Sequence, residues 1–327
     1  MRVLIVKTSS LGDLVHTLPA LTDARAARPG IRFDWLCEKS FAEIPTWHPA
    51  VYRVIPCELR RWRKRLWQTM RSGEWADFKA RLRERQYDLV LDAQGLIKSA
   101  FLASQALGPL AGPDRRSARE PLASWFYQQR IAMPSLRSMH AIERTRHLFA
   151  KALDYAVPAT APSFGLSPER FPQPARNQPY LVFLHATTWP TKCWAESSWQ
   201  ALGRWCVGRG FDVLLPWGNE PERRVAERIA SGCGGVVLPR MGLTEMAGLL
   251  KQAKAVVGVD TGLAHVAAAV ETPCITLYGP TLPGLTGTIG SGQIHLCSTE
   301  ATTVDRQRPT TVPVTRVQET LSALLAP

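Results

Sequence analysis

The sequence lacks any apolar run that approaches the roughly 20 residues of a membrane-spanning helix. Its seven cysteines are an odd number and are scattered without a C-x-x-C pair, which disfavours both a disulfide framework and a zinc site. The short apolar opening is interrupted too early for a signal peptide. We therefore expect a reduced, cytoplasmic protein that binds no metal ion.

Acidic residues are also few, with 27 Asp and Glu against 40 Lys and Arg and a formal charge of +13. This surplus predicts an anionic partner, which could be nucleic acid, a membrane surface or a phosphorylated substrate. No G-x-G-x-x-G sequence follows the first strand of either half, and no Walker A sequence occurs. NAD-dependent dehydrogenases and P-loop NTPases are therefore disfavoured.

Both halves of the chain alternate strand and helix signals, which predicts an α/β protein with two doubly wound parallel sheets. We expect domains over residues 1–157 and 180–327, joined by a proline-rich linker over 158–179, with the last helix a candidate to pack back on the first domain. Residues 109–139 are not assigned, and a helix is expected through the basic segment that holds Trp62 and Met70. The expected strands cover residues 3–6, 33–37, 52–56, 87–92, 180–184, 211–215, 236–238 and 255–259, with 274–278 as the last.

Asp13 follows the first strand, in the segment Ser9–Asp13 that leads into a helix. Ligands of open α/β sheets bind at the carboxyl ends of the strands, so Asp13 is a candidate catalytic carboxylate. Asp is equally suited to cap a helix and complement its dipole. From position alone, both interpretations stand.

The second half offers an anion site at Asp260-Thr261-Gly262, where a helix is expected to begin. Free backbone N–H groups and the helix dipole suit a diphosphate there. His265 on the same helix is as well explained by an ordinary helix position. Thr187, Thr188 and Lys192 could bind phosphate oxygens after another strand, although a solvated lysine is the plainer alternative. Glu222 could accept from ribose hydroxyls or simply occupy a helix N-terminus.

The first half contains Arg60-Arg61-Trp62-Arg63-Lys64-Arg65, five cations and a tryptophan in six residues. The charges would point nearly all round a helix, which disfavours a single face that reads a nucleic-acid groove. An anionic lipid or a phosphorylated acceptor at a membrane surface suits this run better. A merely solvated face is the remaining alternative. Arg119 belongs to a second basic cluster, and His140 to a weaker one.

Several long motifs resemble the ADP-heptose:lipopolysaccharide heptosyltransferases, and the type I members in particular. The resemblance covers residues 1 to about 285 and is carried by the opening Met1–Leu21, Arg60–Lys64, Asp92–Leu96, Ala118–Ala123, Val259–His265 and Tyr278–Thr281. It implies the GT-B fold, two Rossmann-like domains facing a central cleft. It further implies metal-independent, inverting transfer of L-glycero-D-manno-heptose from ADP-heptose to a Kdo residue of Kdo2-lipid A, without a cofactor.

The resemblance also implies roles for individual residues. Asp13 would be the general base for the Kdo hydroxyl, and Lys192 would offset charge on the departing ADP. The donor would be held by Thr187, Thr188, Lys192, Glu222, Met241, Asp260, Thr261, Gly262, Leu263 and His265. The acceptor would be held by Ser10, Arg60, Arg61, Arg63, Lys64, Arg119 and His140. The expected partners are these two substrates and the cytoplasmic membrane surface, with no nucleic acid and a monomeric chain.

Two departures from the family pattern concern the donor side. Trp189–Ala195 differs from the usual sequence around the lysine, and Leu282 stands where an acidic residue is common. Heptosyltransferase II, or a transferase with another acceptor, is the alternative within the family. A non-catalytic binder of nucleic acid or anionic lipid is the alternative from another class, and it predicts binding without turnover.

Overall fold

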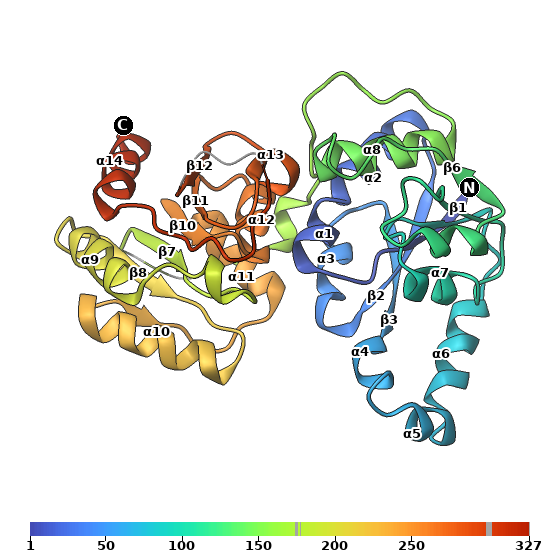
Figure 1. Ribbon diagram of the computed structural model, residues 1–327, viewed down its shortest axis with the longest axis horizontal. Helices are drawn as coiled ribbons and strands as arrows, with labels where there is room; N and C mark the ends of the chain where they lie inside the picture. The colour runs from blue at the N-terminus through green and yellow to red at the C-terminus, as the bar shows by residue number, and fades with distance from the viewer. Residues whose placement is uncertain (174–175, 177, 299–302, 327) are drawn as a thin grey trace. The chain divides into compact units, whose positions relative to one another are not determined.

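The computed structural model describes residues 1–173, 176, 178–298 and 303–326, and divides into two compact units, Met1–Ser167 and Pro168–Pro327 (Figure 1). Positions 174, 175 and 177 of the expected linker lie outside the described residues. Each unit is built on a six-stranded sheet.

The first unit has a fully parallel sheet in the order β3-β2-β1-β4-β5-β6. Its strands are β1 (Arg2–Val6), β2 (Arg32–Glu38), β3 (Val51–Cys57), β4 (Leu89–Asp92), β5 (Leu110–Pro113) and β6 (Gln129–Ile131). The apolar run Val3–Val6 is fully buried, as expected of a central parallel strand with helices on both faces.

Helices cover both faces of this sheet. Leu4 and Val6 belong to a cluster with Phe78, Leu82 and Ala100 from the helices of one face, whereas Phe33 meets Phe149 on the other. The helices are α1 (Leu11–Val15), α2 (Leu18–Ala27), α3 (Glu43–Thr46), α4 (Leu59–Trp62), α5 (Leu66–Arg71), α6 (Glu74–Arg83), α7 (Ile97–Ala103) and α8 (Ala141–Leu153), with the 3-10 turns η1 (Lys39–Phe41) and η2 (Pro121–Phe126).

The second unit repeats the plan with the order β12-β11-β10-β7-β8-β9, again all parallel. Its strands are β7 (Tyr180–Leu184), β8 (Asp212–Leu215), β9 (Val236–Val237), β10 (Ala255–Val259), β11 (Cys274–Tyr278) and β12 (Gln293–Cys297). Its helices are α9 (Glu196–Val207), α10 (Glu220–Cys233), α11 (Leu243–Gln252), α12 (Gly262–Ala269), α13 (Pro283–Thr286) and α14 (Val314–Leu325), with η3 (Pro168–Arg170) and η4 (Pro190–Lys192).

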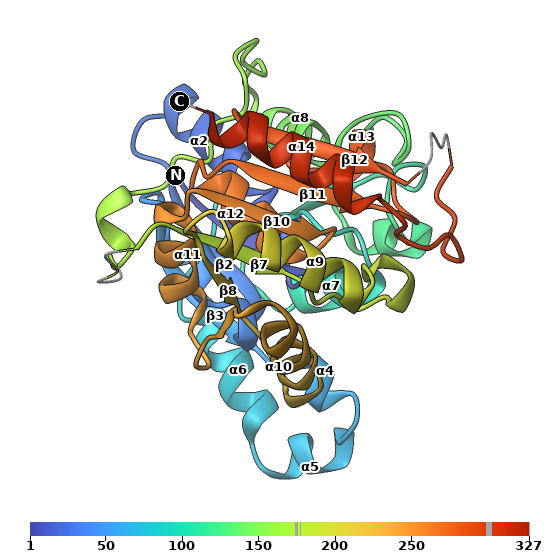
Figure 2. The ribbon, with the colours of Figure 1, turned by 90° about the vertical axis from the view of Figure 1, so that its left-hand side faces the viewer.

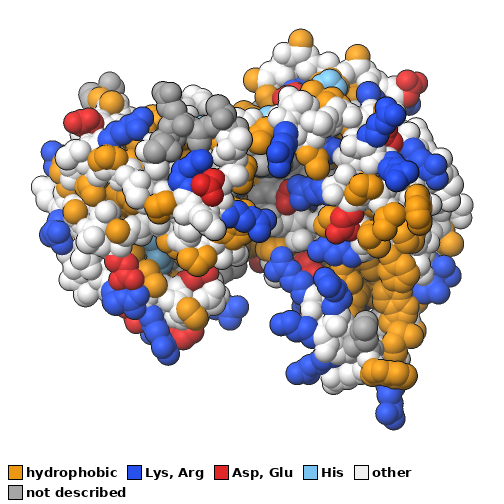
Figure 3. Space-filling view, in the orientation of Figure 1, with side chains coloured by type: hydrophobic (Ala, Val, Ile, Leu, Met, Phe, Trp, Pro, Cys, Tyr) orange, Lys and Arg blue, Asp and Glu red, His pale blue; other side chains and the backbone are white. Residues whose placement is uncertain are grey.

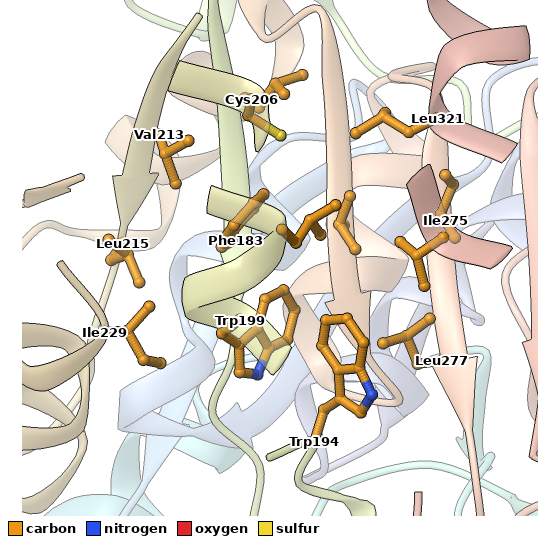
Figure 4. Close-up of a cluster of buried hydrophobic side chains, with 14 of the residues drawn as sticks. Phe183, Trp194, Trp199, Cys206, Val213, Leu215, Ile229, Ile275, Leu277 and Leu321 are labelled. Carbon is orange, nitrogen blue, oxygen red and sulfur yellow. The ribbon is translucent and has the colours of Figure 1, made fainter. Parts of the chain in front are cut away.

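A tightly packed aromatic core supports the second sheet. Trp199 of α9 meets Phe183 of β7 at 5.1 Å and Trp194 at 5.0 Å between ring centroids (Figure 4). The last helix, α14, lies along α9 and buries Val317 and Leu321 in this same core (Figure 2). The buried side chains of α14 thus belong to the core of the second unit.

The two strand orders are the same when counted within each unit, namely 3-2-1-4-5-6. This is the doubly wound dinucleotide-binding order, which confirms the predicted fold class. The strand order reverses between β1 and β4 in the first sheet and between β7 and β10 in the second. Ligands of such folds bind just beyond the carboxyl ends of those strands.

The strand predictions for the apolar runs are confirmed, but three elements differ. The strand at 274–278 is not the last, since β12 follows it. Strands β5 and β6 occupy the unassigned region 109–139. The basic segment forms three short helices, α4, α5 and α6, where one was expected. Gly73, with φ +79°, precedes α6 and separates it from α5.

Candidate active site

Asp13 lies at the carboxyl end of β1, in the short helix α1. One carboxylate oxygen, Oδ2, accepts from the backbone N–H and the hydroxyl of Ser10, at 3.0 and 3.1 Å. The other, Oδ1, accepts from the Arg119 guanidinium at 2.7 Å. Asp13 therefore caps its helix through one oxygen, as the capping interpretation predicts, and pairs with a cation through the other.

Two cations set the charge state of Asp13. Lys7 is buried, with its Nζ 3.8 Å from Oδ1 of Asp13 and 3.0 Å from the carbonyl oxygen of Ala93. Burial raises the pKa of Asp13, but Lys7, Arg119 and the Ser10 amide outweigh it and hold that pKa well below its usual range. Burial in turn lowers the pKa of Lys7 to about 8. Asp13 is consequently ionised at neutral pH.

Gln94, in the turn after β4, holds the loop that leads from β1 to Asp13. Its Oε1 accepts from the backbone N–H and hydroxyl of Thr8, at 2.7 and 2.6 Å, and its Nε2 donates to the Ser9 carbonyl at 2.9 Å. The side chain is buried, so these bonds are shielded from water. Gln94 lies in the Asp92–Leu96 motif, which was quoted for the resemblance but given no role.

Asp92 is a structural residue of the same motif. Its fully buried carboxylate accepts from the amides of Gln94 and Gly95 and from the hydroxyls of Ser99 and Tyr127, at 2.7–3.1 Å. Burial raises the pKa of Asp92 in spite of these four bonds. This carboxylate shapes the turn after β4, and the turn presents Gln94.

The predicted acceptor arginines fall into two kinds. Arg61 bridges two carboxylates, donating to Glu74 at 2.5 Å and to Glu58 at 2.8 Å, and so ties α4 to α6. Arg63 and Lys64 are exposed, and the guanidinium of Arg60 lies over the Phe41 ring at 5.8 Å. Arg60, Arg63 and Lys64 remain candidates for an anionic acceptor, whereas Arg61 also holds the basic segment together.

The two weaker acceptor candidates are helix caps. Ser10 precedes α1 and donates to Asp13, as described. His140 caps α8: its Nδ1 accepts from the amide of Ile142 at 3.2 Å, and its ring meets the edge of His16 at 5.6 Å. His16 follows α1, so His140 lies in the neighbourhood of the Asp13 helix.

In the second unit, Lys192 and Asp260 form an ion pair at the switch point between β7 and β10. Nζ of Lys192 is 2.6 Å from Oδ2 of Asp260, which also accepts from the Thr281 hydroxyl at 2.6 Å. The hydroxyl of Thr187 donates to the Asp260 carbonyl at 3.2 Å. The structure therefore brings together three predicted donor residues and adds Thr281, which belongs to the Tyr278–Thr281 motif.

The unusual loop around Lys192 has its own internal support. The Lys192 ammonium lies 4.7 Å from the centroid of the Trp189 ring, and the Arg306 guanidinium lies 4.5 Å from it. The Thr191 hydroxyl donates to the Arg306 carbonyl at 2.8 Å. Trp189 therefore helps to orient Lys192 through cation–π contact. Thr188, in the same loop, is exposed.

Helix α12 begins at the predicted anion site. Thr261 is its N-cap, in the extended conformation, and Gly262 and Leu263 form the first turn. All three are half-buried, so their backbone stands at the surface of the second unit. His265, one turn further on, is buried within the helix packing. The helix start suits a diphosphate, and His265 has the same 7% exposure as Asp260.

Glu222 is engaged at the start of α10. Its Oε2 accepts from the amide of Gly218 and its Oε1 from the side chain of Asn219, both at 2.7 Å. This is the helix N-terminal role weighed as an alternative. Met241 is half-buried in the segment between β9 and α11. Nearby, the Trp217 indole donates to the Leu238 carbonyl at 2.7 Å, which joins the segments that follow β8 and β9.

Within the described part of the chain, no three or more His, Cys, Asp or Glu residues gather as a metal site would require. Across the same residues, no helix has the length and apolar character needed to cross a membrane.

Comparison with known proteins identifies the family. The model of "Glycosyltransferase family 9 (heptosyltransferase)" matches residues 75–314. Lipopolysaccharide heptosyltransferase 1 of Pseudomonas aeruginosa is 57% identical over 301 residues, covering 91% of this chain and 84% of that protein. The namesake in Escherichia coli K12 is 49% identical over 297 residues, covering 90% and 92%.

Solved structures agree. The structure of E. coli heptosyltransferase WaaC with ADP superposes with a TM-score of 0.90 at 45% identity, covering 99% of this chain and all of that one. WaaC with ADP-2-deoxy-2-fluoro heptose gives 0.87 at 44% identity, with 99% of each chain covered. The chain belongs to glycosyltransferase family 9, the heptosyltransferases.

Proposed function

We propose that this chain transfers L-glycero-D-manno-heptose from ADP-heptose to a Kdo residue of Kdo2-lipid A, with inversion at the anomeric carbon. The single observation that carries the proposal is the Asp13 carboxylate at the β1 switch point, which lies 2.7 Å from the Arg119 guanidinium and 3.8 Å from the Lys7 ammonium. Similar proteins are called lipopolysaccharide heptosyltransferase 1, and this name supports heptose as the transferred sugar and lipopolysaccharide as the product.

The donor binds to the second unit in this proposal. Lys192 exchanges its contact with Asp260 for a phosphate oxygen of ADP-heptose and offsets the charge that develops on departing ADP. Thr187, Thr188 and the α12 start at Thr261–Leu263 hold the diphosphate. Asp260 contacts the heptose, Glu222 the ribose and Met241 the adenine. The solved WaaC complexes with ADP and a fluorinated ADP-heptose support this class of ligand.

The acceptor binds to the first unit, where Asp13 acts as general base. The Kdo hydroxyl attacks the anomeric carbon, its proton passes to Asp13, and the carbon–oxygen bond to ADP breaks with its electron pair leaving on the phosphate. A carboxylate with a lowered pKa is a weak base. The Kdo carboxylate competes with Asp13 for Arg119, and its binding therefore strengthens the base at the moment of use.

The basic residues Arg60, Arg63 and Lys64 meet lipid A phosphates in this proposal, with Ser10 and His140 on the acceptor side. The enzyme needs no metal ion or cofactor and works at the cytoplasmic membrane surface. Heptosyltransferase II activity is the alternative. Similar proteins named heptosyltransferase 2 are only 24% identical, which favours the type I acceptor.

The test is release of ADP from ADP-heptose with Kdo2-lipid A, with an acceptor that already carries the first heptose, and without acceptor. We expect turnover with Kdo2-lipid A alone and an inverted glycosidic product by NMR. Turnover only with the heptosylated acceptor would assign the chain to type II. Binding of both substrates without ADP release would favour a non-catalytic binder.

A further inference from the structure

The turn formed by residues 305–310, between β12 and α14, carries two arginines close to the Lys192 loop. It lies beyond residue 285, where the family resemblance of the sequence ends. Neither Arg306 nor Arg308 forms an ion pair with any residue that the structure describes, and Nη1 of Arg308 is buried without a hydrogen-bond partner there. The one carboxylate of the turn, Asp305, instead accepts from the Gln307 amide at 3.0 Å. The turn therefore carries positive charge that its own carboxylate does not bind.

The turn is bonded to the loop that carries Lys192. The backbone N–H of Thr310 donates to the carbonyl of Thr191 at 3.0 Å, and its hydroxyl lies 3.1 Å from the carbonyl oxygens of Thr191 and Lys192. In return, the Thr191 hydroxyl donates to the Arg306 carbonyl at 2.8 Å. These bonds hold the backbone of Arg306 next to the donor loop, so Arg306 and Lys192 belong to one small framework.

The other side of the turn packs on the segment that supplies Thr281. The Asp305 amide donates to the Pro280 carbonyl at 3.0 Å. A Cβ atom on Gly279 would lie 2.6 Å from the Thr310 hydroxyl oxygen, so this close approach of the two backbones requires a glycine. The turn thus contacts both of the loops that hold the ion pair of the second unit.

One indole ring lies beside both cations. The Arg306 guanidinium is 4.5 Å and the Lys192 ammonium 4.7 Å from the centroid of the Trp189 ring. Lys and Arg side chains are spread over the visible face of the second unit, so exposure alone does not single out Arg306 (Figure 3). Its place beside the ring and the lysine does. Two like charges at one ring repel each other, and Asp260 can neutralise only one of them, so the group favours a further anion.

We propose that Arg306 is a second phosphate-binding cation of the donor site, placed beside Lys192 by the Trp189 ring. A nucleoside-diphosphate sugar carries a negative charge on each phosphate, and its departing ADP carries one more, whereas Lys192 supplies a single positive charge. The guanidinium adds a fork of N–H donors, which suits phosphate oxygens. The inference rests on the proposed function, because it names a further residue for the same donor. It makes the charge of the diphosphate, and not the nucleoside, the feature that Arg306 recognises.

Titration of the full chain with ADP tests this assignment. We expect Arg306→Gln to weaken ADP binding about tenfold, since a charge-assisted bond to phosphate is lost, and Arg306→Lys to recover part of the affinity. Arg209→Gln is the matched control and should bind ADP like the unchanged chain. Arg209 is also an exposed arginine over a tryptophan ring, 3.7 Å from the centroid of Trp205, but it precedes β8, at the opposite end of the strands from the site. Unchanged ADP affinity in Arg306→Gln would overturn the proposal.

Salt dependence distinguishes a contact with a charged ligand from a structural role. Because salt screens exposed charges, ADP binding by the unchanged chain should weaken with added NaCl more steeply than binding by Arg306→Gln. Thermal unfolding should be the same for both chains, since the Arg306 guanidinium is exposed and forms no ion pair with a described residue. Equal salt dependence would overturn the phosphate contact, and a lowered unfolding temperature shared by Arg306→Lys would assign Arg306 to the fold.

The part played by the ring is tested by Trp189→Leu, with Trp189→Phe as the conservative variant. We expect Trp189→Leu to raise the donor KM about tenfold and Trp189→Phe to stay near the original value. Adding Arg306→Gln to Trp189→Leu should cost little more, because the ring and the guanidinium act as one unit. A full additional loss in the double variant would contradict the placement of Arg306 by Trp189.

ADP release separates this inference from the proposed function. If Arg306→Gln binds ADP normally while the unchanged chain transfers heptose to Kdo2-lipid A, the function stands and the inference fails. If ADP affinity depends on Arg306 but no acceptor supports ADP release from ADP-heptose, the function fails and the phosphate contact stands.

Discussion

The charged groups at the two switch points are balanced differently. At the first, one carboxylate, Asp13, faces two cations, Lys7 and Arg119. At the second, one cation, Lys192, meets one carboxylate, Asp260, which is also held by Thr281. A surplus of positive charge keeps a base ionised and attracts an anionic acceptor, whereas a balanced pair has a lysine that a diphosphate can take over. In the proposed mechanism, the same strand order carries a proton acceptor, Asp13, in one unit and a cation for the leaving group, Lys192, in the other.

The largest effect is expected for Asp13→Asn, which tests the carboxylate of the first switch point. Asn keeps the size of the side chain and can still accept from Ser10, but it cannot take a proton. We expect kcat to fall about 1,000-fold, within the usual range for a lost general base, with ADP-heptose affinity nearly unchanged. ADP-release kinetics and donor titration measure the two quantities. Asp154→Asn, at an exposed left-handed helix cap, is the control and should be silent. A kcat near the original value would rule out the base.

Lys192→Met tests the ion pair at the second switch point. In the proposed mechanism, this change removes the charge that offsets departing ADP. It also leaves the Asp260 carboxylate with Thr281 alone, so we expect kcat/KM for the donor to fall about 100-fold. Lys192→Arg should recover part of this loss. Lys254→Met, at an exposed lysine that precedes β10, is the matched control. An unchanged kcat/KM in Lys192→Met would show that the second switch point does not stabilise the leaving group.

A pH titration of stability tests the protonation of Lys7, the buried cation of the first switch point. The pKa of Lys7 is lowered from 10.5 to about 8, so between these values the unfolded chain binds one more proton than the folded chain. The contribution of Lys7 to the free energy of unfolding should therefore rise with pH across that window, by about 3 kcal/mol at most, with no further change in this contribution above it. Denaturant unfolding of the unchanged chain and of Lys7→Met should diverge in this direction. Parallel curves would mean that Lys7 stays charged.

Thr281→Val should have the smallest effect. It removes one hydrogen bond to Asp260 but leaves the Lys192 pair in place, so we expect a loss of about 1–2 kcal/mol in stability and a modest rise in donor KM. Thermal unfolding and donor kinetics report the two changes. A loss as large as that of Lys192→Met would show that the hydroxyl, and not the ammonium, sets the geometry of Asp260.

Local sequence patterns predicted the central strands because β1, β7 and β10 are buried apolar runs with strong strand preference. The same reasoning missed β5 and β6, since Leu110–Pro113 ends in proline and Gln129–Ile131 has only three residues. It also missed β12, which has a histidine at its centre. Pairing with a neighbouring strand stabilises these segments, and that contact is not local.

The candidate site was only partly predictable for the same reason. Position after a strand singled out Asp13 and Asp260, and family resemblance supplied their roles. The partners that set the charge of Asp13 were not visible, because Arg119 is 106 residues away and Lys7 looks like the end of a strand. The contact of Asp13 Oδ2 with Ser10 is easier to read from the sequence, since Ser10 lies three residues before Asp13, at the spacing of a helix cap.

The hydrogen bonds made by Gln94 predict slow hydrogen exchange in the loop after β1. The Thr8 amide belongs to a loop, yet it donates to a buried side-chain oxygen at 2.7 Å and is nearly inaccessible to solvent. Its hydrogen should exchange with deuterium as slowly as those of the central strands, since exchange requires β1 and the turn after β4 to separate. The loop that carries the proposed base is in this sense part of the most persistent structure of the first unit.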